Sequence, residues 1–152
     1  MRLLHIPGVD DAPMWTPICF EQIDTRLARE AAMKGARTFV NITSEGDLGR
    51  QIYWNTLAIA VLRAVELRVG VARCGNMGIS GIIDPWGRQT HHLRGKSGAL
   101  WGEPGVLKAR VPLGDGKPTL YARAGDWPAG ASGMVLMFAM IAALRRRSRV
   151  SG

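Results

Sequence analysis

Thr16-Pro17-Ile18-Cys19-Phe20-Glu21 is the stretch around which this chain is organised. A short apolar run ends in Cys19, and Glu21 follows two residues later, just before a helical pattern begins. A strand, a sharp turn and a helix in that order lift one side chain off the edge of a sheet. The positive N-terminal end of the helix would lie near the sulfur and favour the thiolate. The pattern makes Cys19 a candidate nucleophile; the alternative interpretation is a small, buried, apolar residue.

The segments that follow predict alternating helices and strands. Asp24 is expected to cap a helix over 25–34 that Gly35 ends. A buried strand is expected over 38–43 and a long helix over 51–68. Strand, helix, strand at this spacing indicates a parallel crossover. Beyond residue 69 the apolar period changes to two. This favours short strands and one tight turn, at 71–74, 79–83, 88–93 and 106–111, with the turn over 84–87.

Composition and charge narrow the class of protein. The 152 residues suffice for one domain with a core. The net charge is +8, but four arginines lie in one short tail, namely Arg145, Arg146, Arg147 and Arg149. Without a basic stripe interleaved with aromatic residues, we expect no nucleic-acid partner. Cys19, Cys74 and the three histidines fit no metal-ligand spacing, so neither a metal nor a cofactor is expected. A disulfide between the two cysteines stays open.

The C-terminal segment differs in kind from the rest. Residues 127–144 carry no charge, and three arginines follow them. A membrane-spanning helix needs about 20 apolar residues, with about 17 as the lower limit. Trp127 stands where an interfacial aromatic residue would, and the arginines would mark the cytoplasmic side. The alternatives are a buried C-terminal helix and an amphipathic surface helix.

Six motifs, in order, resemble those of one enzyme family. They are Ile18-Cys19-Phe20-Glu21, Val40-Asn41-Ile42-Thr43, Leu62-Arg63-Ala64-Val65-Glu66, Asn76-Met77-Gly78-Ile79-Ser80, Asp84-Pro85-Trp86-Gly87 and Tyr121-Ala122-Arg123-Ala124-Gly125-Asp126-Trp127-Pro128. The first looks like the family's Ile-Cys-Tyr-Glu around the nucleophile, and the last is similar to the Tyr-x-Arg-x-Gly-Asp-Trp before its last membrane helix. On these motifs, the chain resembles the C-terminal part of the apolipoprotein N-acyltransferases, membrane enzymes whose periplasmic domain has the nitrilase (carbon–nitrogen hydrolase) fold.

The resemblance implies an α/β architecture. We expect a partial nitrilase-like α-β-β-α sandwich followed by one C-terminal transmembrane helix. Residues 1–126 would form the C-terminal half of the nitrilase-like domain, 127–145 the transmembrane helix, and 146–152 a basic cytoplasmic tail. By the same resemblance, the protein would lie in the bacterial inner membrane, with the catalytic domain on the periplasmic side and the C-terminus in the cytoplasm.

The resemblance also implies a two-step acyl transfer. Cys19 would take an acyl chain from a phospholipid as a thioester and pass it to the N-terminal amine of a lipoprotein. Glu21 would support the site without acting as the base, and Cys74 would be structural. The substrate-binding residues expected in the neighbouring loops are Asn41, Asp47 and Asn76.

Several departures from the family pattern qualify this expectation. The family's glutamate base and oxyanion-stabilising lysine lie upstream of the cysteine, and no residue here matches them. We therefore expect the chain alone to be inactive and a second polypeptide to supply the N-terminal half. The loop over 44–49 lacks the family's aromatic pair, and Asn55-Thr56 replaces a Gln-His pair. The alternative functions are a carbon–nitrogen hydrolase (amidase) and a non-catalytic, membrane-anchored remnant.

Overall fold

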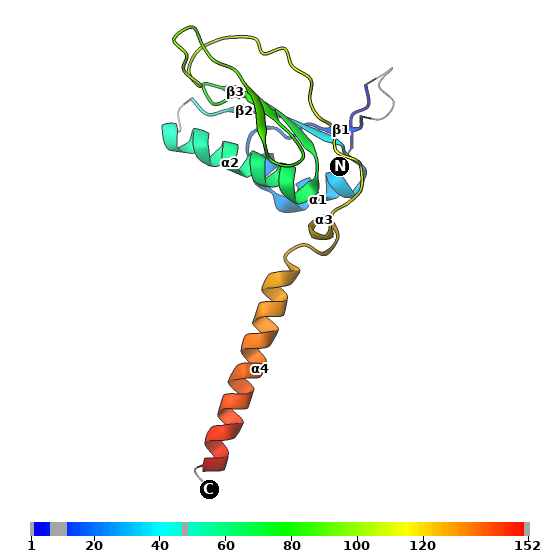
Figure 1. Cartoon of the computed structure of the whole chain (residues 1–152), viewed down its shortest axis with the longest axis vertical. Coiled ribbons are helices and arrows are strands. Elements are labelled where there is room, and N and C mark those ends of the chain that lie inside the picture. Colours follow the sequence, from blue (N-terminus) through cyan, green and yellow to red (C-terminus); the bar gives the residue numbers. More distant parts are fainter. Residues whose placement is uncertain (1, 7–11, 47–48, 151–152) are drawn as a thin grey trace.

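The computed structural model describes residues 2–6, 12–46 and 49–150, and for residues 142–150 it describes only the helical backbone. The described strands form one five-stranded sheet in the order β1-β2-β3-β4-β5, with its helices packed on one side (Figure 1). The strands follow one another in space as they do in sequence, so the chain crosses the sheet once from edge to edge. The α/β class expected from the alternating pattern is confirmed.

The first three strands are parallel. Strands β1 (Met14–Trp15), β2 (Thr38–Ser44) and β3 (Gly70–Asn76) pair side by side and are joined through helices α1 (Thr25–Met33) and α2 (Arg50–Leu67). The Asp24 side chain accepts hydrogen bonds from two amides of the first turn of α1, which confirms the expected cap. Gly35, with φ +92°, follows the helix.

The remaining strands turn back antiparallel and are shorter than expected. They are β4 (Gly81–Ile83) and β5 (Gln89–His92). The turn between them is as expected, since the Gly87 amide bonds the Asp84 carbonyl at 2.9 Å and Gly87 has φ +83°. The strand expected over 106–111 is absent from the described sheet. Its apolar residues find no neighbouring strand, and Val106 is 93% exposed.

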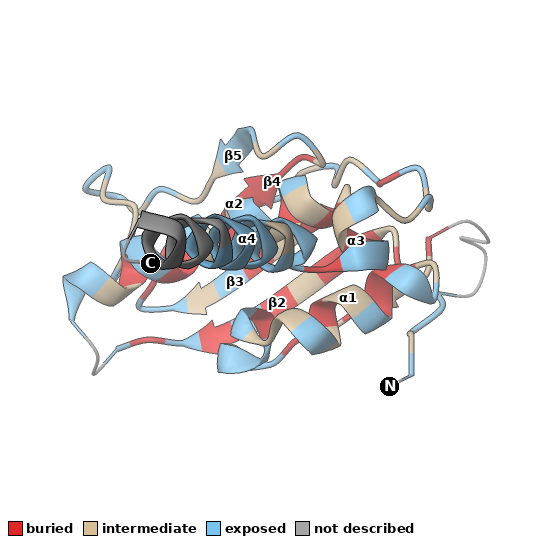
Figure 2. Cartoon of the chain, turned by 90° about the horizontal axis from the view of Figure 1, so that it is seen from below, coloured by how far each residue is buried: buried red, intermediate tan, exposed pale blue. Residues whose placement is uncertain are grey.

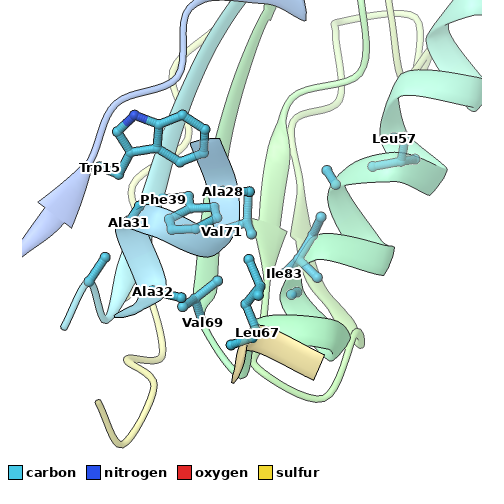
Figure 3. Close-up of a cluster of buried hydrophobic side chains, with 14 of the residues drawn as sticks. Trp15, Ala28, Ala31, Ala32, Phe39, Leu57, Leu67, Val69, Val71 and Ile83 are labelled. Atoms are coloured by element: carbon cyan, nitrogen blue, oxygen red, sulfur yellow. The ribbon is translucent and has the colours of Figure 1, made fainter. Parts of the chain in front are cut away.

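The core lies between the sheet and the helices. Trp15 and Phe39 meet edge to face at 4.8 Å, and three alanines of α1 allow that helix to pack closely on them (Figure 3). Side chains from α2 and the central strands complete the cluster, including Leu57, Leu67, Val69, Val71 and Ile83. The other face of the sheet carries no helix in the described residues. A segment without regular structure, residues 93–119, runs past that face (Figure 1).

The C-terminal helix leaves this domain. The short helix α3 (Leu120–Ala124) packs on α1 and α2, and α4 (Trp127–Val150) then projects away from the domain (Figure 1). Every described residue of α4 is exposed or half-buried (Figure 2). Across the described part of the chain, no helix has both the length and the apolar character to cross a membrane. The span expected over 127–145 includes residues 142–145, whose side chains lie outside the described residues.

Candidate active site

Cys19 begins a single 3-10 turn, η1 (Cys19–Ile23), between the sheet and α1. The strand expected to reach the cysteine ends earlier, at Trp15, and an isolated parallel bridge from Ile18 to Ile42 brings the chain back beside β2. Cys19 itself has φ +52°, which is left-handed backbone that residues other than glycine rarely adopt. Such strain persists only where the surroundings enforce it, and it concentrates at functional sites.

The sulfur of Cys19 is half-buried beside β2. The Thr43 hydroxyl donates to Sγ across 3.8 Å, so a polar side chain from the end of the strand contacts the thiol directly. The sequence pattern did not single out Thr43. Side chains two residues apart on a strand share a face. The position of Thr43 two residues after Asn41 could therefore have indicated that both lie on the side of the cysteine.

Glu21 lies on the surface of the turn. Its Oε2 accepts the amide hydrogen of Ile18 at 2.8 Å, immediately before the cysteine. The carboxylate therefore fixes the backbone that enters the turn. This arrangement is compatible with the supporting role expected for Glu21.

Asn41 is fully buried beneath the turn. Its Nδ2 donates to the Pro17 carbonyl at 3.1 Å and to the Cys19 carbonyl at 3.5 Å. Its Oδ1 accepts from Arg73 Nη1 at 3.2 Å. Both polar atoms are thus occupied by protein partners, and no surface of Asn41 is left for the substrate contact expected from the sequence.

Arg73 forms the centre of a buried polar cluster, although the sequence pattern did not single it out. It is ion-paired with Glu45, and its Nη2 donates to the Thr56 hydroxyl at 2.8 Å. The Thr56 hydroxyl lies 2.6 Å from Glu45 Oε1. The departure from the family pattern at position 56 therefore lies inside a closed cluster beneath the sheet and not in an open pocket.

Arg63 of α2 reaches the far end of the same turn. Its guanidinium donates to the carbonyls of Gln22 at 3.2 Å and Ile23 at 3.1 Å, and to Thr25 Oγ1 at 3.1 Å. It also pairs with Glu66, which lies three residues later on the same side of α2. Because the same guanidinium bonds Glu66 and the carbonyls of the turn, this ion pair helps to hold Arg63 against the turn and is more than a solvated surface contact.

A cavity of about 420 Å³ opens on the helix-free side of the sheet. Thr43 contributes to its wall, which also includes Ile42, Cys74, Asn76 and Met77. Thr43 thus lines this cavity and also contacts the Cys19 sulfur, whereas Cys19 itself is not part of the cavity wall. The side chain of Asn76 bonds Ser44 Oγ at 3.2 Å at the rim, whereas Asp47 lies outside the described residues.

Cys74 and Cys19 are both free thiols, so the structure contains no disulfide between them. The structural role expected for Cys74 would suggest that it packs in the core. Instead, Cys74 is exposed on the helix-free face. Within the described ranges, no three histidine, cysteine, aspartate or glutamate side chains come together in a way that could hold a metal ion.

Comparison with solved structures places the fold. An amidase from Nesterenkonia sp. AN1 in complex with butyramide matches with a TM-score of 0.58 at 18% identity, covering 86% of this chain and 46% of the amidase. A second structure of that amidase, with acrylamide added at its active-site cysteine, matches with a TM-score of 0.54 at 18% identity, again over 86% of this chain and 48% of the other. The sheet and its helices therefore correspond to about half of a nitrilase-superfamily fold.

Comparison with curated proteins finds relatives that share one name. The chain is 39% identical over 134 residues to the apolipoprotein N-acyltransferase of Geobacter metallireducens, which covers 86% of the chain and 24% of that protein. It is 36% identical over 148 residues to the apolipoprotein N-acyltransferase of Bradyrhizobium diazoefficiens, covering 95% of the chain and 25% of that protein. No family model matched the chain. The chain spans about a quarter of the length of these relatives, and over most of its own length it is a homologue of proteins named apolipoprotein N-acyltransferase.

Proposed function

We propose that this chain carries the nucleophilic thiol of an apolipoprotein N-acyltransferase. The observation that carries the proposal is the left-handed backbone of Cys19, at φ +52°, in a turn between the sheet and α1. A non-glycine residue in this conformation indicates that the surroundings enforce a particular direction for its side chain. The similarity to proteins named apolipoprotein N-acyltransferase suggests acyl transfer as the reaction of that strained cysteine.

The proposed reaction passes through a thioester. The Cys19 thiolate attacks the carbonyl carbon of a phospholipid ester, the carbon–oxygen bond breaks, and the lysophospholipid leaves as an alcohol after taking a proton. The N-terminal amine of a lipoprotein then attacks the thioester carbonyl, the carbon–sulfur bond breaks, and an amide forms. The amine loses its proton, and Cys19 returns to its initial state. Splitting one difficult transfer into two steps is the general advantage of covalent catalysis.

The proposed activity needs more protein than this chain contains. Neither the base nor the oxyanion donor of the resembled family has a matching residue here, and loss of one oxyanion donor alone typically costs about 10²–10³ in rate. The helix-free face of the sheet, where Ile42 is 54% exposed, is the proposed contact surface for the missing half, supplied by a preceding segment or a second polypeptide. We expect the chain alone to form no thioester.

The proposal places α4 in contact with lipid. Its exposed side chains between 134 and 141 are apolar, and no described part of the protein covers them: Met134, Val135, Leu136, Met137, Phe138, Met140 and Ile141. The orientation proposed with this contact is a periplasmic catalytic domain and a cytoplasmic C-terminus. The test is whether alkaline carbonate releases the expressed chain from membranes. Full release would contradict insertion of α4.

The reaction is tested in a chimera in which the N-terminal part of the Geobacter metallireducens relative precedes this chain. Membranes holding the chimera are incubated with a fluorescent phospholipid and a lipoprotein acceptor. Cys19→Ala is expected to abolish transfer, because no thioester can form, and Cys74→Ala to retain most of it. Transfer that survives Cys19→Ala, or is lost only in Cys74→Ala, would contradict the proposal. Hydrolysis of butyramide without acyl transfer would instead indicate an amidase.

Glu21 is tested in the same chimera with Glu21→Gln. The glutamine keeps an acceptor for the Ile18 amide but loses the negative charge beside the turn. A role in the site predicts a loss of turnover with little change in melting temperature. A helix-start carboxylate, worth roughly 0.3–1 kcal/mol, predicts the opposite pattern.

A further inference from the structure

The turn that holds Cys19 is bound at both ends by buried side chains from other elements. At its beginning, Asn41 of β2 donates to the carbonyls of Pro17 and Cys19. At its end, Arg63 of α2 donates to the carbonyls of Gln22 and Ile23. The sequence separation between each donor and its targets means that neither contact belongs to the local geometry of the turn.

We propose that Asn41 and Arg63 are positioning residues that together hold Cys19 in its left-handed conformation. A non-glycine residue in that region is strained, so something outside the residue must enforce it. Asn41 fixes the carbonyl of Cys19 itself and that of Pro17, two residues earlier, and Arg63 fixes the carbonyls of Gln22 and Ile23 at the far end of the turn. Because both ends of the turn are held, the backbone between them has little room to change, and the direction of the Cys19 side chain is fixed with it.

The orientation of Asn41 is itself determined by Arg73. An amide side chain offers an acceptor on one side and a donor on the other. Arg73 Nη1 donates to the Asn41 oxygen, which forces the nitrogen towards the turn. Arg73 is in turn held by its ion pair with Glu45, by the Thr56 hydroxyl, and by the Ile79 carbonyl, which lies 3.0 Å from Arg73 Nε. A continuous series of hydrogen bonds therefore connects Glu45 with the backbone of Cys19.

Arg63 supplies the second hold through the fork of its guanidinium. Nε and Nη2 reach two successive carbonyls, and Nη1 pairs with Glu66. The side chain is only 11% exposed, so these bonds replace contacts with water. The planar fork of donors is preorganised to bind two carbonyls at once in a fixed geometry, which the freely rotating ammonium of a lysine does not impose. This gives the Leu62–Glu66 motif a role at the cysteine and not only on the helix surface.

The test measures the backbone conformation of Cys19 by NMR in the full 152-residue chain, using the amide–Hα coupling and the Cα and Cβ shifts. Asn41→Asp keeps an acceptor for Arg73 but loses the donor to the turn, and Arg63→Met keeps the apolar stem but loses every donor. Each variant is expected to lose the left-handed signature of Cys19. Amide exchange at Phe20 to Ile23 should become about tenfold faster, because the turn then opens locally.

Thr38→Val is the matched control. The Thr38 hydroxyl donates to the Gly70 carbonyl at 3.1 Å and is buried at the opposite end of β2, so the variant loses a comparable bond away from the cysteine. It should lower the melting temperature and leave the Cys19 signals unchanged. If either test variant fails to fold, Asn41→Ser or Arg63→Lys is measured in its place.

A Cys19 that stays left-handed in the Asn41 variant or in the Arg63 variant would overturn the two-sided hold. So would a loss of the signature in Thr38→Val, because the effect would then be general destabilisation. The catalytic consequence, a lower kcat at unchanged KM in the chimera, rests on the proposed function. The NMR result does not, so failure of the acyl transfer assay and failure of this inference are distinguishable.

Discussion

The two faces of the sheet differ in how far their side chains are buried. On the helix-covered face, Phe39, Val71 and Ile83 are each at most 2% exposed, and even the charged Arg73 and Glu45 are buried as a pair. On the other face, Ile42 is 54% exposed and Cys74 is exposed as well. Both sets come from the same strands, because alternate residues of a strand point to opposite faces.

This difference separates the part of the chain that folds on its own contacts from the part that stays exposed to solvent. A contiguous apolar area that water reaches is a common mark of an interaction surface. The helix-free face exposes the apolar Ile42 and carries a cavity whose wall includes Thr43 and Cys74, and residues 102–105 of the irregular segment after β5 line that cavity as well. The buried apolar contacts that stabilise the fold therefore lie mainly on the helix-covered face. The proposed activity also needs the contact surface proposed for the helix-free face.

The largest expected effect comes from breaking the buried ion pair on the covered face. Arg73→Leu removes the guanidinium and leaves Glu45 charged, unpaired and buried, which should lower the free energy of unfolding by about 3–5 kcal/mol. Urea unfolding followed by circular dichroism measures the change. Arg88→Leu is the control, since the side chain of Arg88 is 76% exposed although it too is paired with an aspartate.

If Arg73→Leu lowered the free energy of unfolding no more than Arg88→Leu does, the buried cluster around Arg73 would not be a source of stability. A partial recovery in the double variant Arg73→Leu/Glu45→Leu would show that the uncompensated carboxylate accounts for the loss.

The next effect compares the same substitution on the two faces. Ile83→Ala removes a fully buried side chain and should cost about 2–5 kcal/mol in the isolated chain, whereas Ile42→Ala should stay within about 0.5 kcal/mol. Urea midpoints at constant slope give both values. In the chimera, the loss caused by Ile42→Ala should increase if the missing half covers this face. An unchanged value there would argue against the helix-free face as the contact surface.

The smallest effect concerns a carboxylate on the covered side. Burial of Asp84 opposes its ionisation. The hydrogen bonds from the Arg88 side chain and from the amides of Arg88 and Trp86 outweigh this and hold the pKa of Asp84 below its ordinary value. A lowered pKa stabilises the fold at pH values above the ordinary aspartate value, and that stabilisation is lost as the pH falls through the lowered one. The stability difference between the wild type and Asp84→Asn should therefore shrink in acid. A difference that is constant from pH 7 to about pH 3 would contradict this assignment.

Local rules predicted the parts of the fold that local contacts determine. Asp24 caps α1 as its position suggested, α2 begins and ends within one residue of the predicted bounds, and the turn at Asp84 has its expected bond. The buried strand β2 was also predicted from its β-branched and aromatic residues. In each of these segments, the residues that favour the element also contact one another along the sequence.

The features that the sequence could not supply depend on distant partners. The pairing of Glu45 with Arg73, and the contacts of Asn41 and Arg63 with the cysteine turn, join segments that only the fold brings together. The pattern over 106–111 favours a strand, but without a neighbouring strand its backbone bonds cannot form a ladder, and the segment stays irregular. The pattern made Cys19 a candidate nucleophile, which stays a prediction, but it did not predict the left-handed conformation of Cys19, whose neighbours in the fold lie far away in the sequence.

The mixed pairing of the sheet has a consequence for the order in which the chain folds. Strands β4 and β5 pair across a tight turn, whereas β1, β2 and β3 pair only after the chain has closed a helical crossover each time. Contacts that close short loops form faster than those that close long ones, because less chain entropy is lost before the first contact is made. During folding, the hairpin should therefore form early and the turn around Cys19 late, since the strand β2 and the helix α2 that anchor it belong to the slow crossovers. The thiol would then reach its reactive geometry as one of the last events of folding.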